Sequence, residues 1–75
     1  MMSERTILVT GGAGLLGHAL LEQLHVESRV ALDSARPRDP LDRVVYVDAD
    51  LRDASRVRDI VRGYGVTDVL HAGGI

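Results

Sequence analysis

An apolar run meets a glycine cluster in residues 6–17, which read TILVTGGAGLLG. The β-branched and aliphatic residues Thr6–Thr10 predict a strand that is buried on both faces of a parallel sheet. The following glycines, Gly11–Gly14, predict a turn. From Leu15 to about His25 the apolar spacing becomes helical, and we expect one stripe to hold Leu16, Leu20 and Leu24, with Leu21 beside it. The segment therefore predicts a strand that passes through a glycine turn directly into a helix.

The next segment predicts two strands joined without a helix. Arg29–Asp33 is short and apolar and ends on an acidic residue, which indicates a second strand. Residues Ser34–Arg43 contain two prolines among alternating charges and show no apolar period, so we expect an irregular loop there. Val44–Val47 predicts the third strand.

The remainder predicts a second helix and a fourth strand. Asp53 is a good N-cap for a helix that should end near Gly63, followed by the exit turn Gly63–Gly65. Thr67–His71 is the predicted fourth strand. The order β-α-β-β-α-β indicates an α/β fold with a parallel sheet and helices packed on its faces, because neighbouring parallel strands need crossovers.

Composition limits the classes of function. The 75 residues are 45% apolar and 27% charged, which is typical of a folded domain. The absence of cysteine excludes disulfides and cysteine-based metal sites. A net charge of −2 argues against a nucleic-acid partner. No signal-peptide pattern or membrane-length apolar stretch is present, so we expect a cytoplasmic protein without a membrane partner.

The glycine spacing Gly11-x-x-Gly14-x-x-Gly17 lies between a predicted strand and a predicted helix, the context that indicates dinucleotide binding. Gly11 permits the tight turn, Gly14 lets the backbone approach a diphosphate, and Gly17 lets the helix pack closely on the sheet. The helix beginning near Leu15 would point its free N–H groups at the phosphates. Asp33 ends the second strand, where a carboxylate accepts hydrogen bonds from the adenosine ribose.

Three segments together resemble the extended short-chain dehydrogenase/reductases, which include nucleotide-sugar epimerases and dehydratases. Thr10–Gly17 is similar to their Thr-Gly-x-x-Gly-x-x-Gly signature, Asp50-Leu51 to a pair that contacts adenine, and His71–Gly74 to a His-x-Ala-Ala segment beside the cofactor. In the last segment glycines replace the usual alanines. The resemblance implies a partial Rossmann fold that binds NAD, with NADP left open. Motif and resemblance together give these cofactor-binding candidates: Gly11, Gly14, Leu15, Leu16, Gly17, Asp33, Asp50, Leu51, Ala72 and Gly73.

The family's Tyr-x-x-x-Lys pair is missing from this sequence. All nine basic residues are arginine, and the positions four residues after Tyr46 and Tyr64 hold Asp50 and Asp68. A phenol needs a neighbouring cation to act as a base at neutral pH. We therefore expect no catalytic residue here. Residues 1–75 are interpreted as the N-terminal part of an NAD(P)-binding domain, inactive alone, with the substrate domain absent. Tyr46 is expected to face a helix or solvent, and Tyr64 to lie in a turn.

Several polar groups have two interpretations. His18, Glu22 and His25 share a helical face, which suggests a metal site, but we favour a solvated polar face. His71 ends a strand expected to be buried, where a structural role is favoured over catalysis. The loop residues Arg36, Arg38 and Arg43 either meet a 2′-phosphate or belong to a solvated loop. Because Asp33 would repel a 2′-phosphate, we favour NAD over NADP.

Three hypotheses for function follow. The leading one is part of an NAD-dependent epimerase, dehydratase or reductase acting on a nucleotide-sugar or related small molecule. The second is a non-catalytic sensor that binds the same dinucleotide. The third and weakest is a self-sufficient small α/β binding module, and a homo-oligomeric state is left open.

Overall fold

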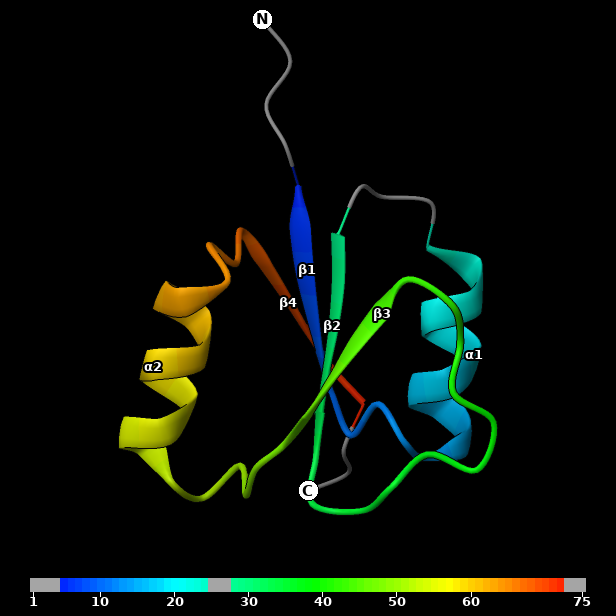
Figure 1. Cartoon of the computed structure of the whole chain (residues 1–75), viewed down its shortest axis with the longest axis horizontal. Coiled ribbons are helices and arrows are strands. Elements are labelled where there is room, and N and C mark those ends of the chain that lie inside the picture. Colours follow the sequence, from blue (N-terminus) through cyan, green and yellow to red (C-terminus); the bar gives the residue numbers. More distant parts are fainter. Residues whose placement is uncertain (1–4, 25–27, 73–75) are drawn as a thin grey trace, which may run out of the picture.

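The computed structural model describes residues 5–24 and 28–72. The predictions made for His25 and Gly73 therefore lie outside the described residues. The elements, drawn in Figure 1, are β1 (Thr6–Thr10), α1 (Leu15–Gln23), β2 (Ser28–Asp33), β3 (Val44–Asp48), α2 (Ala54–Gly63) and β4 (Asp68–His71). This is the element order that the sequence predicts, with helix α1 ending earlier than expected.

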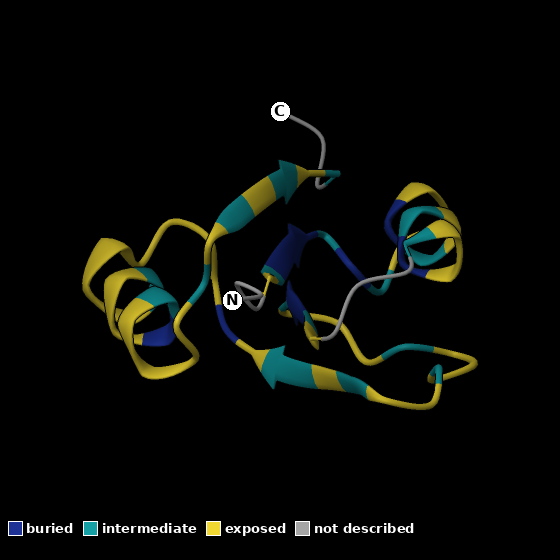
Figure 2. Ribbon diagram, turned by 90° about the horizontal axis from the view of Figure 1, so that it is seen from above, coloured by how far each residue is buried: buried dark blue, intermediate teal, exposed yellow. Residues whose placement is uncertain are grey.

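The four strands form one parallel sheet in the order β3-β2-β1-β4. Strands β1, β2 and β3 follow one another towards one edge, and the chain then returns across the sheet to place β4 beside β1. Because right-handed crossovers in opposite directions put their helices on opposite faces, α1 and α2 lie on the two sides of the sheet, as Figure 2 shows. The predicted α/β fold with parallel strands is confirmed.

The sheet separates two apolar cores. On the α2 side the buried residues are Leu8, Val30, Leu32, Ala49 and Ile60. On the α1 side they are Ile7, Val9, Leu21 and Ala31. The central strand β1 contributes to both cores, as predicted for a strand buried on both faces.

The buried face of α1 differs from the predicted stripe. Gly17 and Leu21 are its buried residues, whereas Leu16 is 60% exposed. A Cβ on Gly17 would lie 2.2 Å from the carbonyl oxygen of Gly11, so this glycine allows the helix to touch the turn before it. That contact rotates the helix so that Leu21, four residues further on, faces the sheet.

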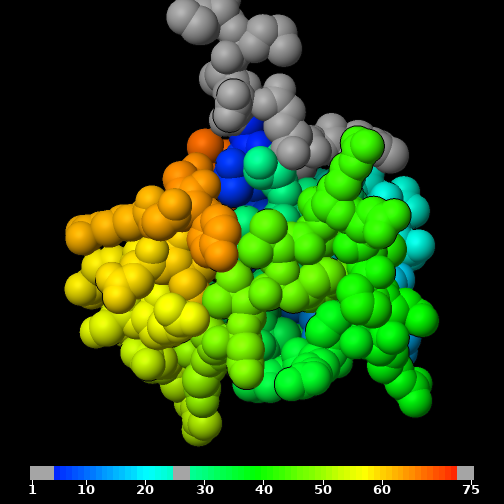
Figure 3. Space-filling view, viewed as in Figure 1, coloured from blue at the N-terminus to red at the C-terminus, as the bar shows by residue number. Residues whose placement is uncertain are grey.

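The predicted loop between β2 and β3 is confirmed as irregular, and it covers the α1 side of the sheet. Leu41 packs on the α1-side core, and its N–H donates to the Tyr46 hydroxyl at 3.0 Å. The Arg29 guanidinium donates to the carbonyls of Leu21 at 2.7 Å and Asp42 at 3.1 Å, which ties the loop to α1. Tyr46 packs on the α1-side core, which includes Leu21 of α1, and its hydroxyl also bonds to this loop. In Figure 3 the green loop and the cyan of α1 lie on the same side of the molecule.

Helix α2 has the predicted start and end. The Asp53 carboxylate accepts from the N–H of Arg56 at 3.1 Å. At the other end Gly65 has φ +64°, Gly65 N–H donates to Arg62 and Val66 N–H donates to Val61, which is a Schellman motif. Tyr64 lies in the turn, as predicted.

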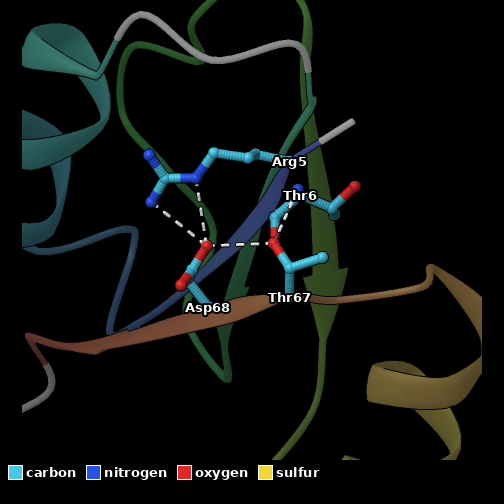
Figure 4. A network of polar contacts seen from close by, with 4 residues as sticks. All are labelled: Arg5, Thr6, Thr67 and Asp68. Atoms are coloured by element: carbon cyan, nitrogen blue, oxygen red, sulfur yellow. Dashed lines mark hydrogen bonds and ion pairs between the residues drawn. The ribbon is translucent and has the colours of Figure 1, made fainter. Parts of the chain in front are cut away.

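Polar contacts join the starts of β1 and β4, as Figure 4 shows. The N–H of Thr6 donates to the Thr67 hydroxyl at 3.1 Å, and Arg5 donates to Asp68 at 3.2 Å. The Thr67 hydroxyl, followed by Arg5, lowers the pKa of Asp68. No helix among the described residues has the length and apolarity needed to cross a membrane.

Candidate dinucleotide-binding site

The predicted cofactor residues follow the carboxyl ends of the parallel strands. Residues 11–17 follow β1, Asp33 ends β2, Asp50 and Leu51 follow β3, and Ala72 follows β4. The strands are parallel, so all these segments lie together where the carboxyl ends of the strands meet, at the bottom of the sheet in Figure 1. The strand order reverses at β1, and such a switch point is where open α/β sheets bind ligands.

The glycine turn is tightly constrained. Gly11 has φ +71°, a conformation that favours glycine, and its N–H donates to the carbonyl of Leu32 at 2.8 Å. A Cβ on Gly17 would clash with the backbone of Gly11 and Gly12. The proposed conformational role of Gly11 and packing role of Gly17 therefore each have a direct structural basis.

The two other glycines of the turn differ in the space around them. A Cβ on Gly12 would lie 2.5 Å from the Cβ of Ala31 in β2, so Gly12 also permits a close approach. Sequence reasoning gave Gly12 no role of its own, since it stands outside the triplet spacing. A Cβ on Gly14 would meet only the oxygen of Gly11, at an ordinary 3.6 Å. The protein's own packing therefore does not require glycine at position 14.

The start of α1 presents backbone donors. The first bond into the helix runs from the N–H of His18 to the carbonyl of Gly14 at 2.9 Å. Within the described part of the chain, the N–H groups of Leu15, Leu16 and Gly17 have no backbone acceptor. The N-cap residue Gly14 has no side chain to cap them. Three donors at the positive end of a helix dipole can bind an anion such as a diphosphate.

Asp33 is held by two backbone groups. One carboxylate oxygen accepts from the N–H of Ala13 at 3.0 Å, and the other accepts from Ala35 at 2.9 Å. The predicted ribose-binding carboxylate thus lies beside the glycine turn. The sequence pattern does not predict the bond between Asp33 and Ala13, because the two residues lie at the ends of different strands and are brought together only by the sheet.

Two cavities flank the loop after β2. One of about 190 Å³ is lined by Asp33, Arg36, Pro37 and Asp48, together with Ala31, Ala35, Tyr46 and Val47. The other, of about 410 Å³, is lined by Ala13, Gly14, Leu15, His18, Arg38 and Asp39. Arg36 and Arg38 thus face separate cavities, while Arg43 immediately precedes β3 and has φ +64°. Contact with a 2′-phosphate and exposure in a solvated loop both stay predictions for these arginines.

Asp50 is paired with a residue that the sequence analysis did not single out. The Arg52 guanidinium donates to both carboxylate oxygens, at 2.8 Å to the nearer one, and the Arg52 N–H donates to Oδ1, also at 2.8 Å. These hydrogen bonds lower the pKa of Asp50 from 3.8 to about 2. Asp50 and the exposed Leu51 lie at the same edge as the glycine turn but line neither cavity.

The end of β4 is attached to the end of β1. Ala72 N–H donates to the carbonyl of Thr10 at 2.9 Å, and Nδ1 of His71 is hydrogen-bonded to the buried Thr10 hydroxyl. His71 itself is exposed, and Val69 on the same face is 52% exposed. The expectation that β4 is buried was wrong. Helix α2 covers the centre of one face of the sheet, and β4 is the edge strand, at the margin of that face.

The suggested metal group is only partly described. His18 and Glu22 approach to 3.6 Å as a pair one helical turn apart, and His25 lies outside the described residues. Across residues 5–24 and 28–72, no three metal-ligating side chains come together.

A glycine turn, free helix donors and a strand-end carboxylate at a switch point define this chain as a dinucleotide-binding unit of the Rossmann type. The family model described as "NAD dependent epimerase/dehydratase family" matches residues 7–75, and the chain belongs to that family. The resemblance noted from the sequence is confirmed.

Solved structures of two enzymes agree with this assignment. Uronate dehydrogenase from Agrobacterium tumefaciens, solved as a mutant with NAD, is 32% identical over 97% of this chain, with a TM-score of 0.79. The enzyme WbmG from Bordetella bronchiseptica with NAD is 26% identical over 97% of the chain, with a TM-score of 0.72. The chain spans only 28% and 26% of the lengths of those two proteins. No curated protein sequence matched the chain.

Proposed function

We propose that this chain forms the N-terminal, NAD-binding portion of a nucleotide-sugar epimerase, dehydratase or related reductase. The observation that carries the proposal is the group of three free N–H donors at Leu15–Gly17, which lies at the switch point beside Asp33. In the proposed complex these donors bind the diphosphate of NAD. The free space at Gly14 lets the diphosphate approach the backbone.

The remaining candidates complete the proposed site. Asp33 has lone pairs left for the ribose hydroxyls and disfavours a 2′-phosphate, which supports NAD over NADP. Asp50 and Leu51 are assigned to the adenine, and Ala72 and Gly73 to the side of the cofactor next to β4. When bound, NAD supplies the hydride acceptor for oxidation of a substrate hydroxyl.

The substrate class rests on the related enzymes. Uronate dehydrogenase acts on a uronate by its name, and WbmG has also been solved with NAD and UDP together. A sugar or nucleotide-sugar hydroxyl is therefore the proposed substrate of the parent protein. The present 75 residues contain no lysine and no Tyr-x-x-x-Lys pair, so they are proposed to bind the cofactor without turning over substrate.

The binding proposal is tested by titrating NAD and NADP into the ¹⁵N-labelled chain. We expect NAD to shift the amide signals of Leu15, Leu16 and Gly17, with little change at Arg58 on the exposed side of α2. NADP should bind more weakly. Absence of any NAD-dependent shift, or shifts confined to α2, would contradict the proposal.

The alternative function is a non-catalytic sensor that binds the same dinucleotide, since all the described features serve binding alone. The two are separated in a longer chain that includes this segment. Conversion of a sugar or nucleotide-sugar substrate, lost when the tyrosine of a Tyr-x-x-x-Lys pair is replaced by phenylalanine, supports the enzyme. Substrate conversion is followed directly, because an epimerase or dehydratase returns the hydride and leaves no net reduction of NAD. Binding of NAD without conversion of any sugar substrate supports the sensor.

A further inference from the structure

The site contains a bond that the ribose-binding role of Asp33 does not explain. One carboxylate oxygen accepts from Ala13 in the glycine turn at 3.0 Å, and the other accepts from Ala35 in the loop after β2 at 2.9 Å. Both bonds exist within the protein alone. The carboxylate therefore joins the glycine turn to the loop after β2.

The bond to Ala13 completes the hydrogen bonding of the turn. Gly11 and Gly12 donate to the carbonyl of Leu32, and Gly14 donates to that of Gly11. Ala13 is the one remaining amide of the turn, and Asp33 accepts its N–H. The donors left for a ligand are thus those of Leu15, Leu16 and Gly17, which follow directly from the turn.

We infer that Asp33 is a positioning residue for the diphosphate as well as a ribose ligand. By holding Ala13, it fixes the turn whose end sets the direction of the Leu15 and Leu16 N–H groups. A carboxylate has about four lone-pair positions, so two backbone bonds leave room for two ribose hydroxyls. This inference rests on the proposed function. It adds that Asp33 also strengthens the binding of diphosphate ligands that lack those ribose hydroxyls.

The distinguishing experiment uses two ligands, ADP and 2′,3′-dideoxy-ADP. Asp33→Asn keeps the size of the side chain but replaces one acceptor oxygen with a donor, so it cannot accept from both amides. If Asp33 only binds ribose, the substitution leaves affinity for the dideoxy ligand unchanged. If Asp33 also positions the turn, we expect about a tenfold loss for the dideoxy ligand, and a greater loss for ADP.

The matched control is Asp42→Asn in the same loop, whose backbone carbonyl, and not its side chain, is the group bonded to Arg29. It should leave both affinities unchanged. A change equal to that of Asp33→Asn would show a general effect of charge and overturn the inference. Failure of the unsubstituted chain to bind either ligand would instead contradict the proposed function.

A second measurement tests the Asp33–Ala13 bond in the unsubstituted chain, so it does not require any variant to fold. In a long-range HNCO spectrum of the unsubstituted chain without ligand, the Ala13 amide should show a coupling through its hydrogen bond to the Asp33 carboxyl carbon. Its hydrogen exchange should be slow, like that of Gly14. Rapid exchange at Ala13 with no coupling would overturn the inference, whatever the affinities.

Discussion

At the scale of single residues, Gly14 and Gly17 differ in what surrounds them. A Cβ at Gly17 would overlap backbone atoms that cannot move independently of the turn, while one at Gly14 would make only an ordinary contact. Gly14 adopts an extended conformation, with φ −81°, that any residue can take. The fold therefore requires glycine at 17, whereas the requirement at 14 belongs to the proposed ligand.

We predict opposite behaviour for Gly17→Ala and Gly14→Ala. Gly17→Ala should lower the free energy of unfolding by about 1–3 kcal/mol or more, because α1 must move away from the turn. Gly14→Ala should cost under about 1 kcal/mol, the loss expected at an N-cap, yet weaken NAD binding at least about tenfold. Urea unfolding and NAD titration of both variants provide the check. Normal NAD affinity in Gly14→Ala would argue against diphosphate contact there.

The carboxyl of Asp50 should titrate far below its usual range. Hydrogen bonds from Arg52 lower its pKa from 3.8 to about 2 in the folded chain. Because the folded-state pKa is depressed, the stabilisation is present above about pH 3.8 and is lost as the pH falls towards 2. Carbon NMR of the Asp50 carboxyl should give the low value, and Arg52→Ala should return it towards 3.8. Arg58→Ala is the control, and a low value that survives Arg52→Ala would exclude this cause.

At the scale of elements, local patterns predict the strands and both helices, but long-range contacts decide which faces are buried. The apolar spacing of α1 is equally compatible with Leu16 or Leu21 facing inward. Contact between Gly17 and the turn selects Leu21, which lies one helical turn after Gly17, and the leucine spacing alone does not encode that choice. In the same way, the glycine motif and Asp33 are visible in sequence, whereas the Asp33–Ala13 bond depends on the register of β1 and β2.

Two glycines at the end of α2 should change the stability of the chain in opposite directions when they are replaced by alanine. Gly63 is the last helical residue and has nothing near the position of a Cβ, so Gly63→Ala should stabilise the chain by about 0.5–1 kcal/mol. Gly65 is equally uncrowded but has φ +64°, so Gly65→Ala should destabilise it by about 1–2 kcal/mol. Thermal unfolding followed by circular dichroism compares the two. If both variants shift the unfolding temperature equally and in the same direction, the left-handed backbone at Gly65 does not contribute to stability as predicted.

At the scale of the whole molecule, each face of the sheet depends on one deeply buried side chain from its helix. Leu21 of α1 is fully buried on one side and Ile60 of α2 is 3% exposed on the other. At about 0.05–0.15 kcal/mol per residue, a chain of this size has only about 4–11 kcal/mol of stability. Truncation of either side chain to alanine costs about 2–5 kcal/mol, a large share of that total.

Leu21→Ala and Ile60→Ala should therefore both destabilise the entire chain, because β1 belongs to both cores and the two faces unfold together. Their effects on binding should differ. Ile60→Ala should keep its NAD affinity while folded, since α2 carries no diphosphate donor, and NAD at 100 times its Kd should restore about 2.7 kcal/mol. Leu21→Ala should bind NAD more weakly, because it loosens the helix that carries Leu15 and Leu16. Urea unfolding with and without NAD, followed by amide signals on each face, measures both effects. Loss of the α2-side signals at lower urea than the α1-side signals would show that the faces are independent.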